Sequence, residues 1–358
     1  MFQQHQRGGA DDTALWRRFV ALFLRVFVCG AALAYLLILL IDPYGVVPFS
    51  LPLDRAFVSI AQRHMYPQIV RSRRYDSLVI GTSTSRLFDP HVLDKSFNAH
   101  FANLSMSALQ PWEQRTMIDL FLRTIGPPKV LIVGLDSVWC AADADRNLTL
   151  YGFPEWMYDD NPWNDYLYLL NMATAEIAGR MVGYQFGLTP ERIRLDGYQI
   201  LTPVETHYDA AKAQRGIWLG RKPQALPDTP PPVLSPEERQ ALPFPALPWL
   251  DAILARMPAE SLKILVFVPV HVAAQPWPGS REVAVEAECK ARVASIARRR
   301  GAKLIDWRIA SPITRVDSNY WDRLHYRPPI ADLLAKQLED AVLQGTESTD
   351  GSYRLVVR

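Results

Sequence analysis

Short apolar runs that alternate with helical stretches constrain the fold of this 358-residue chain more than any other feature. The apolar runs cover residues 77–80, 129–134, 262–270 and 302–307, with a further candidate at 100–104. The helical stretches cover residues 111–125, 281–300 and 329–343. Strands that are apolar on both faces are typical of a parallel sheet with helices on either side. The pattern therefore predicts an α/β fold in which helices flank a parallel sheet.

Residues 19–41 form a second kind of apolar run, interrupted only by Arg25. About 20 apolar residues are what one helix needs to cross a bilayer. Cations lie on the N-terminal side of the run at positions 7, 17, 18 and 25, whereas Asp42 follows it and the next cation is Arg55. By the positive-inside rule, this asymmetry predicts a single-pass protein with a cytoplasmic N-terminus and its main domain on the other side.

A cleaved signal peptide is the alternative, because Ala32-Leu33-Ala34 has the form of a cleavage site. That triplet lies inside the apolar run, however, with Tyr35 to Ile41 still to follow. A cleavage site normally follows the apolar region. We therefore favour an uncleaved membrane anchor.

Composition excludes several classes of function. The net charge of +2 gives no support for nucleic-acid binding, which needs a basic face. The run Arg298-Arg299-Arg300 is typical of a solvated helix end. Histidines and cysteines are too scattered for metal-ligand spacing, and neither G-x-G-x-x-G nor a Walker sequence is present. We expect no metal and no cofactor.

The three cysteines leave two alternatives open. Cys29 lies in the predicted span, so only Cys140 and Cys289 would be exported. They could form one disulfide in an oxidising compartment, or they could remain two buried thiols. Because two scattered cysteines do not make a disulfide framework, we favour buried thiols.

The chain divides along its length into segments of different character. We predict a cytoplasmic N-terminus (1–18), the anchor (19–41), a juxtamembrane connector (42–75), the α/β domain (76–345) and a C-terminal tail (346–358). Residues 141–258 interrupt the domain as an insertion with helices and a Pro-rich strap. The aromatic residues of 151–168 could stack on sugar rings or simply pack the insertion onto the sheet.

Two short segments carry residue types that suit nucleophilic catalysis. Gly81-Thr82-Ser83 follows the first apolar run, and Asp322-Arg323-Leu324-His325 precedes the last helix. A serine hydroxyl becomes a useful nucleophile when an imidazole takes its proton and a carboxylate orients the imidazole. The order predicts Ser83 as nucleophile, His325 as base and Asp322 as orienting carboxylate. The alternative is a serine in a tight turn and an Asp–His pair that caps the last helix.

These segments resemble the SGNH (GDSL-like) hydrolase superfamily, and within it the membrane-anchored members that modify bacterial cell-surface polysaccharides. The resemblance covers residues 76–345 without the insertion. It implies a three-layer SGNH-hydrolase-like domain in the periplasm, held in the inner membrane by the helix at 19–41. It also implies that Ser83, Asp322 and His325 are the catalytic residues.

The resemblance further implies oxyanion-hole or substrate-positioning roles for Ser107 and Asp136. Ser107 takes the position of a glycine in the family's second sequence motif, and Asp136 takes the position of an asparagine in its third motif. An ionised carboxylate donates no hydrogen bond and would repel an oxyanion. Three alternatives follow. In the first, Asp136 is turned away, for example toward Arg86, while backbone amides form the oxyanion hole. In the second, Asp136 positions an acceptor hydroxyl. In the third, the site binds its ligand without catalysing a reaction.

The function that the resemblance implies is O-acyl transfer, foremost O-acetyl, to or from a cell-surface or exported polysaccharide. Relatives of this kind work beside a membrane-bound acyltransferase, so such a partner is implied too. The alternative is a catalytically silent glycan-binding or adaptor protein of a polysaccharide-modification complex. His271, at the end of the 262–270 run, points to the same sheet edge, and we favour a structural role for it.

Overall fold

The computed structural model describes residues 5–53, 55–146, 149 and 151–358, and of residues 5–12 the backbone alone. The chain divides into two compact units. The smaller unit comprises Met1–Val58 and Asp160–Glu191, and the larger comprises Ser59–Asp159 and Arg192–Arg358.

The larger unit is built on a six-stranded sheet in the order β2-β1-β3-β4-β5-β6. Its strands are β1 (Ser77–Ile80), β2 (Phe101–Asn103), β3 (Val130–Leu135), β4 (Leu262–Phe267), β5 (Lys303–Asp306) and β6 (Arg354–Val357). Strands β1 to β5 pair in parallel, and β6 runs antiparallel to β5. The predicted α/β fold is confirmed, and the sheet, which we had predicted to be parallel, is parallel except for β6. Strand β6 lies in the segment that we had predicted to be a tail, so that assignment is wrong.

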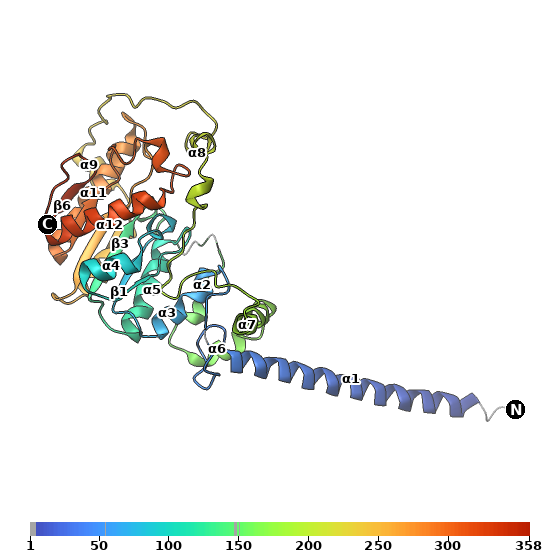
Figure 1. Ribbon diagram of the computed structural model, residues 1–358. Coiled ribbons are helices and arrows are strands. Elements are labelled where there is room, and N and C mark those ends of the chain that lie inside the picture. The colour runs from blue at the N-terminus through green and yellow to red at the C-terminus, as the bar shows by residue number, and fades with distance from the viewer. Residues whose placement is uncertain (1–4, 54, 147–148, 150) are drawn as a thin grey trace. The chain divides into compact units, whose positions relative to one another are not determined.

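Helices cover both faces of this sheet (Figure 1). One face carries α4 (Pro90–Phe97) and α12 (Pro328–Leu343). The other carries α3 (Pro67–Arg71), α5 (Pro111–Thr124), α10 (Leu247–Ala255) and α11 (Arg281–Arg300). As predicted, Arg298, Arg299 and Arg300 form the last turn of a helix, where cations favour the helix dipole.

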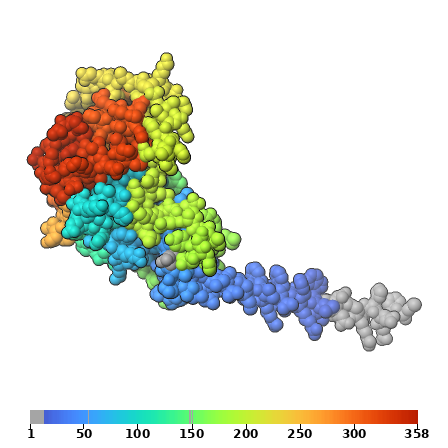
Figure 2. Space-filling view, viewed as in Figure 1, coloured from blue at the N-terminus to red at the C-terminus, as the bar shows by residue number. Residues whose placement is uncertain are grey.

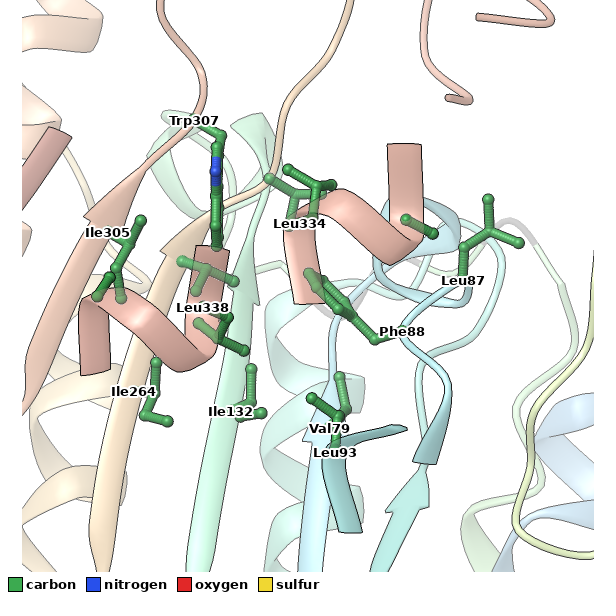
Figure 3. Packing of buried hydrophobic residues seen from close by; sticks show 14 of the residues in the cluster. Val79, Leu87, Phe88, Leu93, Ile132, Ile264, Ile305, Trp307, Leu334 and Leu338 are labelled. Carbon is green, nitrogen blue, oxygen red and sulfur yellow. The ribbon is translucent and has the colours of Figure 1, made fainter. Parts of the chain in front are cut away.

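The core on the α12 face consists of alternate residues of the parallel strands. Ile132, Ile264 and Ile305 are fully buried there beneath Leu334 and Leu338 of α12 (Figure 3). Burying one such side chain stabilises the fold by roughly 1.5–3 kcal/mol. Because the predicted Asp-x-x-His segment directly precedes α12, this packing also fixes the position of that segment.

The predicted connector and insertion are parts of the two units rather than separate bodies. Helices α2 (Gln62–Met65) and α3 of the connector belong to the larger unit, where α3 packs against α5. Within the insertion, α8 (Ala210–Ile217), α9 (Pro236–Ala241) and α10 also belong to the larger unit. The Pro-rich residues 222–235 run without helix or strand between α8 and α9, and their yellow surface borders the red C-terminal elements (Figure 2).

The larger unit also contains short 3-10 helices. They are η1 (Ser83–Ser85), η2 (Ser137–Cys140), η3 (Glu155–Met157), η4 (Glu205–His207), η5 (Val272–Ala274) and η6 (Asp317–Asn319).

A disulfide joins Cys140, at the end of η2, to Cys289 of α11. Their Cα atoms lie 5.9 Å apart, and the residues are separated by 149 positions in the sequence. Our preference for two buried thiols is therefore wrong. The crosslink ties the segment that follows β3 to the helix layer on the α11 face.

The smaller unit contains α1 (His5–Ile41), α6 (Pro162–Tyr168) and α7 (Met172–Gln185). Residues Thr13–Ile41 of α1 form a helix that is long and apolar enough to cross a membrane, with a hydropathy of 2.5. The apolar side chains of this stretch, among them Phe23, Phe27 and Leu33, are exposed. A helix with these properties agrees with the predicted membrane anchor.

Candidate active site

Strand β1 delivers Ser83 to the carboxyl edge of the sheet through a tight turn. Gly81 and Thr82 follow the strand, and Ser83 begins η1. The fully buried Ser85 packs its side chain against Gly81 and Gly134. A Cβ atom would lie 2.4 Å from the Ser85 Oγ at position 81 and 1.9 Å from it at position 134. Glycines are therefore required at both positions for η1 to fold back onto the strand ends.

A small loop presents Asp322 and His325 on the approach to α12. The N–H of Trp321 donates to the carbonyl of His325 at 2.9 Å and closes the loop. Asp322 Oδ1 accepts from the N–H groups of Leu324 at 2.7 Å and His325 at 2.9 Å, which fixes the carboxylate within the loop. These two hydrogen bonds restrain the part of the loop that carries Asp322.

A buried tyrosine joins this loop to the serine turn. The Tyr326 hydroxyl, next to His325, donates to the carbonyl of Thr84 at 2.5 Å, and Tyr326 is fully buried. Tyr326, which follows His325, is thus hydrogen-bonded to Thr84, which follows Ser83. This contact explains how two segments 242 positions apart keep a fixed separation.

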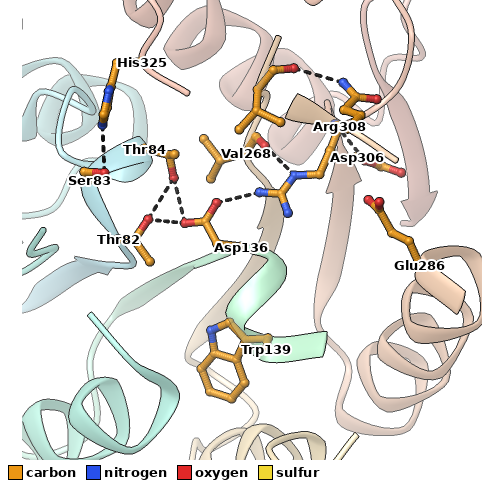
Figure 4. Close-up of polar contacts among 12 residues, drawn as sticks. Thr82, Ser83, Thr84, Asp136, Trp139, Val268, Glu286, Asp306, Arg308 and His325 are labelled. Atoms are coloured by element: carbon orange, nitrogen blue, oxygen red, sulfur yellow. Dashed lines mark hydrogen bonds and ion pairs between the residues drawn. The ribbon is translucent and has the colours of Figure 1, made fainter. Parts of the chain in front are cut away.

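The three predicted catalytic side chains form one hydrogen-bonded chain. His325 Nε2 lies 2.9 Å from Ser83 Oγ (Figure 4), and His325 Nδ1 lies 2.7 Å from Asp322 Oδ2. The carboxylate favours the tautomer in which Nδ1 carries the proton, which leaves Nε2 to accept from the serine hydroxyl. This arrangement can transfer a proton from the hydroxyl to the imidazole as the oxygen attacks a carbonyl carbon.

The carboxylate of this chain is ionised at neutral pH. Burial acts to raise the pKa of Asp322, but hydrogen bonds from His325 and from the Leu324 and His325 N–H groups outweigh it. The pKa of Asp322 therefore lies below its ordinary value. A negative carboxylate both orients the imidazole and stabilises its protonated form.

Ser83 opens into a cavity of about 530 Å³ in the larger unit. Its lining includes residues from four strand ends or the turns that follow them: Thr82, Ser83, Asp136, Val270 and Arg308. Ala108 lines the same cavity. Ligand sites of parallel sheets lie at such carboxyl ends.

Ser107 does not offer its N–H to an oxyanion, the first of the two roles that we had predicted for it. Its N–H donates to Gln62 Oε1 at 3.0 Å and its hydroxyl accepts from Arg86 Nη1 at 2.9 Å, so this N–H is not available to an oxyanion. The next residue, Ala108, takes a left-handed backbone conformation with φ of 52°. Within the described part of the chain, the N–H groups of Ala108 and Ser83 have no acceptor.

Asp136 is held by three donors at the end of β3. The hydroxyls of Thr82 and Thr84 both donate to its Oδ2, the latter at 2.8 Å, and Arg308 Nη2 donates to its Oδ1 at 2.6 Å (Figure 4). Its cationic partner is therefore Arg308 and not Arg86, the example that we had considered. Because the ion pair is buried, Arg308 offsets the negative charge within the cavity wall.

Two residues of this site were missed in the sequence. Arg308 follows β5 by two positions, and a charged residue just past a strand end is a signal that could have identified it. Ala108 gave no signal, because alanine rarely takes a left-handed conformation.

His271 has contacts that agree with the favoured structural role. Its ring is fully buried, and Nδ1 accepts from the N–H of Ala273 at 3.1 Å. Its Nε2 lies 3.1 Å from Asp317, which also accepts from the indole of Trp218. Burial lowers the pKa of His271 more than Asp317 raises it, so the ring is neutral at pH 7. It holds the starts of η5 and η6 together.

No family model matches the chain, and no curated protein matches it. Among the described residues, no group of three or more His, Cys, Asp or Glu side chains could hold a metal ion.

Proposed function

We propose that this protein is a membrane-anchored, SGNH-like enzyme that transfers O-acyl groups, foremost O-acetyl, to or from a cell-surface or exported polysaccharide. The observation that supports the proposal is the chain from Ser83 through His325 to Asp322, with contacts of 2.9 and 2.7 Å. Distances of this size suit a nucleophile and its general base.

In the proposed reaction, Ser83 Oγ attacks the ester carbonyl while His325 Nε2 takes the hydroxyl proton. The N–H groups of Ser83 and Ala108 are the proposed donors to the oxyanion. The intermediate collapses as His325 returns the proton to the departing alkoxide, which leaves the acyl group on Ser83. A sugar hydroxyl or water then attacks this ester, His325 accepts its proton, and Ser83 leaves with that proton.

Two features support a periplasmic location for the reaction. The cations lie before the apolar part of α1, which favours export of the residues that follow it. The Cys140–Cys289 disulfide is typical of an oxidising compartment. The membrane-bound acyltransferase partner remains part of the proposal through the resemblance alone.

One observation supports a second candidate function. Asp136, at the position where the resemblance expects a donor, supplies a carboxylate whose contacts are all to donors of the cavity wall. A catalytically silent domain that holds glycan without reacting would tolerate this residue. The two candidates differ in whether Ser83 is nucleophilic.

Labelling by a serine-directed fluorophosphonate tests the proposal on the full chain in detergent. We expect wild type to be labelled, and Ser83→Ala to lose both labelling and hydrolysis of an acetyl ester. Ser137→Ala is the matched control, because Ser137 lines the same cavity outside the hydrogen-bonded chain, and it should remain labelled. A folded wild type that is never labelled would contradict the enzyme and favour the silent glycan-binding protein.

A further inference from the structure

A second cavity of about 540 Å³ lies in the larger unit next to the Ser83 cavity. Residues 60–64, 151–152 and 199–201 line it, together with Arg86 and Ser107. Two chain connections link it to the Ser83 cavity. Arg86 directly follows η1, which begins at Ser83, and Ser107 directly precedes Ala108.

Arg86 is a buried cation of this cavity without an acidic partner. The residue is 6% exposed, and Nη1 donates to Ser107 Oγ while Nη2 donates to Gln199 Oε1. Both acceptors are neutral, and its Nε has no partner. Across the described residues, Arg86 forms no ion pair with any carboxylate.

The other ionisable groups near the cavity do not balance this charge. Arg63 is paired with Glu113 through two hydrogen bonds of 2.7 and 3.0 Å, so that carboxylate is already used. Burial lowers the pKa of His64, which leaves its ring neutral at pH 7. Desolvation also lowers the pKa of Arg86, but an arginine stays charged at neutral pH.

Such an arrangement is unfavourable unless an anion completes it. A buried charge without a counter-ion loses its hydration and gains no compensating attraction. The planar guanidinium is nevertheless held in one orientation by two neutral acceptors, which prepares it for the paired oxygens of a carboxylate or phosphate. The exposed apolar side chains of Ile60 and Ile200 and the ring of Tyr151 lie beside it, as suits the apolar face of a sugar.

We propose that this cavity binds an anionic group, a carboxylate or a phosphate, of the glycan whose hydroxyl reacts at Ser83. The inference rests on the proposed function for the identity of the ligand as a glycan. Arg86 lies three residues after Ser83, so their Cα atoms are at most about 11 Å apart. A glycan chain seated at one cavity therefore reaches the other, and the substrate class is an acidic polysaccharide.

Titration calorimetry on the full chain in detergent tests this site with two matched ligand pairs. The first pair is glucuronic acid and its uncharged methyl ester, and the second is glucose 6-phosphate and glucose. We expect the charged member of at least one pair to bind about tenfold or more tightly than its neutral partner. The pair that shows the preference identifies carboxylate or phosphate. Equal binding within both pairs would overturn the proposal without any variant being made.

Variants then assign the preference to Arg86. Arg86→Gln should abolish the preference for the charged ligand, whereas Arg298→Gln, which removes an exposed arginine of α11, should keep it. Retention of the preference in a folded Arg86→Gln protein would also overturn the proposal. Fluorophosphonate labelling separates the two hypotheses. Labelling without a charge preference overturns the anion site alone, and a charge preference without labelling overturns the enzyme alone.

A different observation, in the smaller unit, supports a second inference. Large apolar side chains on α6, on α7 and just beyond their ends are between 62% and 85% exposed: Trp163, Leu167, Leu170, Met172, Phe186 and Leu188. Helix α7 packs against α1 within the same unit. The Tyr35 hydroxyl, inside the apolar part of α1, donates to the carbonyl of Tyr166 at 2.6 Å.

We infer that the lipid bilayer covers this apolar surface, so that α6 and the start of α7 lie in the membrane interface. Through α7 and Tyr166 this surface adjoins α1, which must itself be surrounded by lipid along Thr13–Ile41 if it crosses the membrane. Trp163 and Tyr166 are residue types that favour the boundary between lipid and water. Apolar helix faces of this kind bind membranes in the interfacial plane.

Spin labels on single cysteines test the lipid contact in nanodiscs of phosphatidylethanolamine and phosphatidylglycerol. In a Cys29→Ser background, labels at Leu167→Cys and Met172→Cys should be more accessible to oxygen than to a water-soluble nickel chelate. A label at Arg298→Cys, an exposed charged position of α11 in the larger unit, is the control and should show the reverse. Nickel-dominated accessibility at both apolar positions would overturn the inference and favour a protein partner instead.

Discussion

Asp136 illustrates how the chemistry of one residue depends on its partners. The isolated carboxylate would oppose an oxyanion, yet Thr82 and Thr84 both donate to it and Arg308 offsets its charge. These two threonines flank Ser83 in the sequence. Asp136 therefore acts as a positioning residue, because it holds both neighbours of the serine on the wall of the cavity.

The buried pair of Asp136 and Arg308 should show strong coupling in unfolding experiments. Arg308→Gln leaves a buried carboxylate unpaired, and Asp136→Asn leaves a buried guanidinium unpaired. Each single variant should lose about 3–5 kcal/mol of the free energy of unfolding. The double variant should lose clearly less than the sum of the two, as measured by urea denaturation. Additive losses would show that the ion pair does not form.

Replacement of Asp322 should affect both rate and pH dependence. Asp322→Asn favours the wrong tautomer of His325, so ester hydrolysis should fall by about 10⁴-fold while the protein stays folded.

The pH dependence follows from the lowered pKa of Asp322. The carboxylate contributes stability that is complete above its unfolded pKa of about 3.9 and is lost as the pH falls through the lower folded value. The difference in melting temperature between wild type and Asp322→Asn should therefore shrink below about pH 3.9. A difference that grows in acid would contradict this assignment.

At the scale of elements, the sequence predicted those strands and helices whose own residues show a clear apolar or helical pattern. The strands β1, β3, β4 and β5 and the helix α11 were predictable from continuous apolar runs and helical composition. Ser83 and the Asp322–His325 segment were identifiable because each adjoins such an element. The hydrogen bonds among them depend on long-range packing, and no pattern in the sequence gives their distances.

The elements that were missed owe their positions to distant contacts. Strand β6 is a short edge strand, in which Arg354 is exposed and Leu355 buried, and its pairing with β5 defines it. Helix α10 looked like part of an insertion, but its packing against α5 and α11 makes it part of the helix layer. Likewise, the left-handed conformation of Ala108 is imposed by the surrounding fold.

The packing of η1 against the sheet makes Gly134 irreplaceable without a compensating change. A Cβ atom at this position would lie 1.9 Å from Ser85 Oγ and 3.1 Å from Ser85 Cβ. Gly134→Ala should therefore cost about 1–3 kcal/mol of the free energy of unfolding and displace Ser83. Addition of Ser85→Gly, which removes both close atoms, should recover part of that stability.

Gly179→Ala is the matched control for this element. Its Cβ atom would meet nothing within 4 Å, and alanine is favoured over glycine in a helix such as α7. Unfolding free energies should show no loss for this variant. Equal losses at both glycines, or no recovery with Ser85→Gly, would contradict the proposed steric cause.

At the scale of the whole molecule, the anchor and the disulfide are two independent features that bear on the proposed periplasmic location. The charge asymmetry around α1 concerns insertion into the membrane, whereas the Cys140–Cys289 bond concerns the redox state around the larger unit. Cys29 lies in α1 and remains a free thiol. The three cysteines therefore report separately on the two units.

Thiol counting in intact cells tests this location directly. After rapid denaturation without reductant, a maleimide reagent should modify Cys29 alone, and after reduction it should modify all three cysteines. If the larger unit faced the reducing cytosol, all three would react in both conditions.

The crosslink should also be measurable as stability of the larger unit. A Cys140→Ser/Cys289→Ser double variant should lose about 2–5 kcal/mol of the free energy of unfolding, because the bond closes a long loop in the unfolded chain. Cys29→Ser should lose none, since Cys29 takes no part in the crosslink. The double variant loses a tie between the segment after β3, which carries Asp136, and α11. Its ester hydrolysis should therefore fall more steeply with temperature than that of Cys29→Ser.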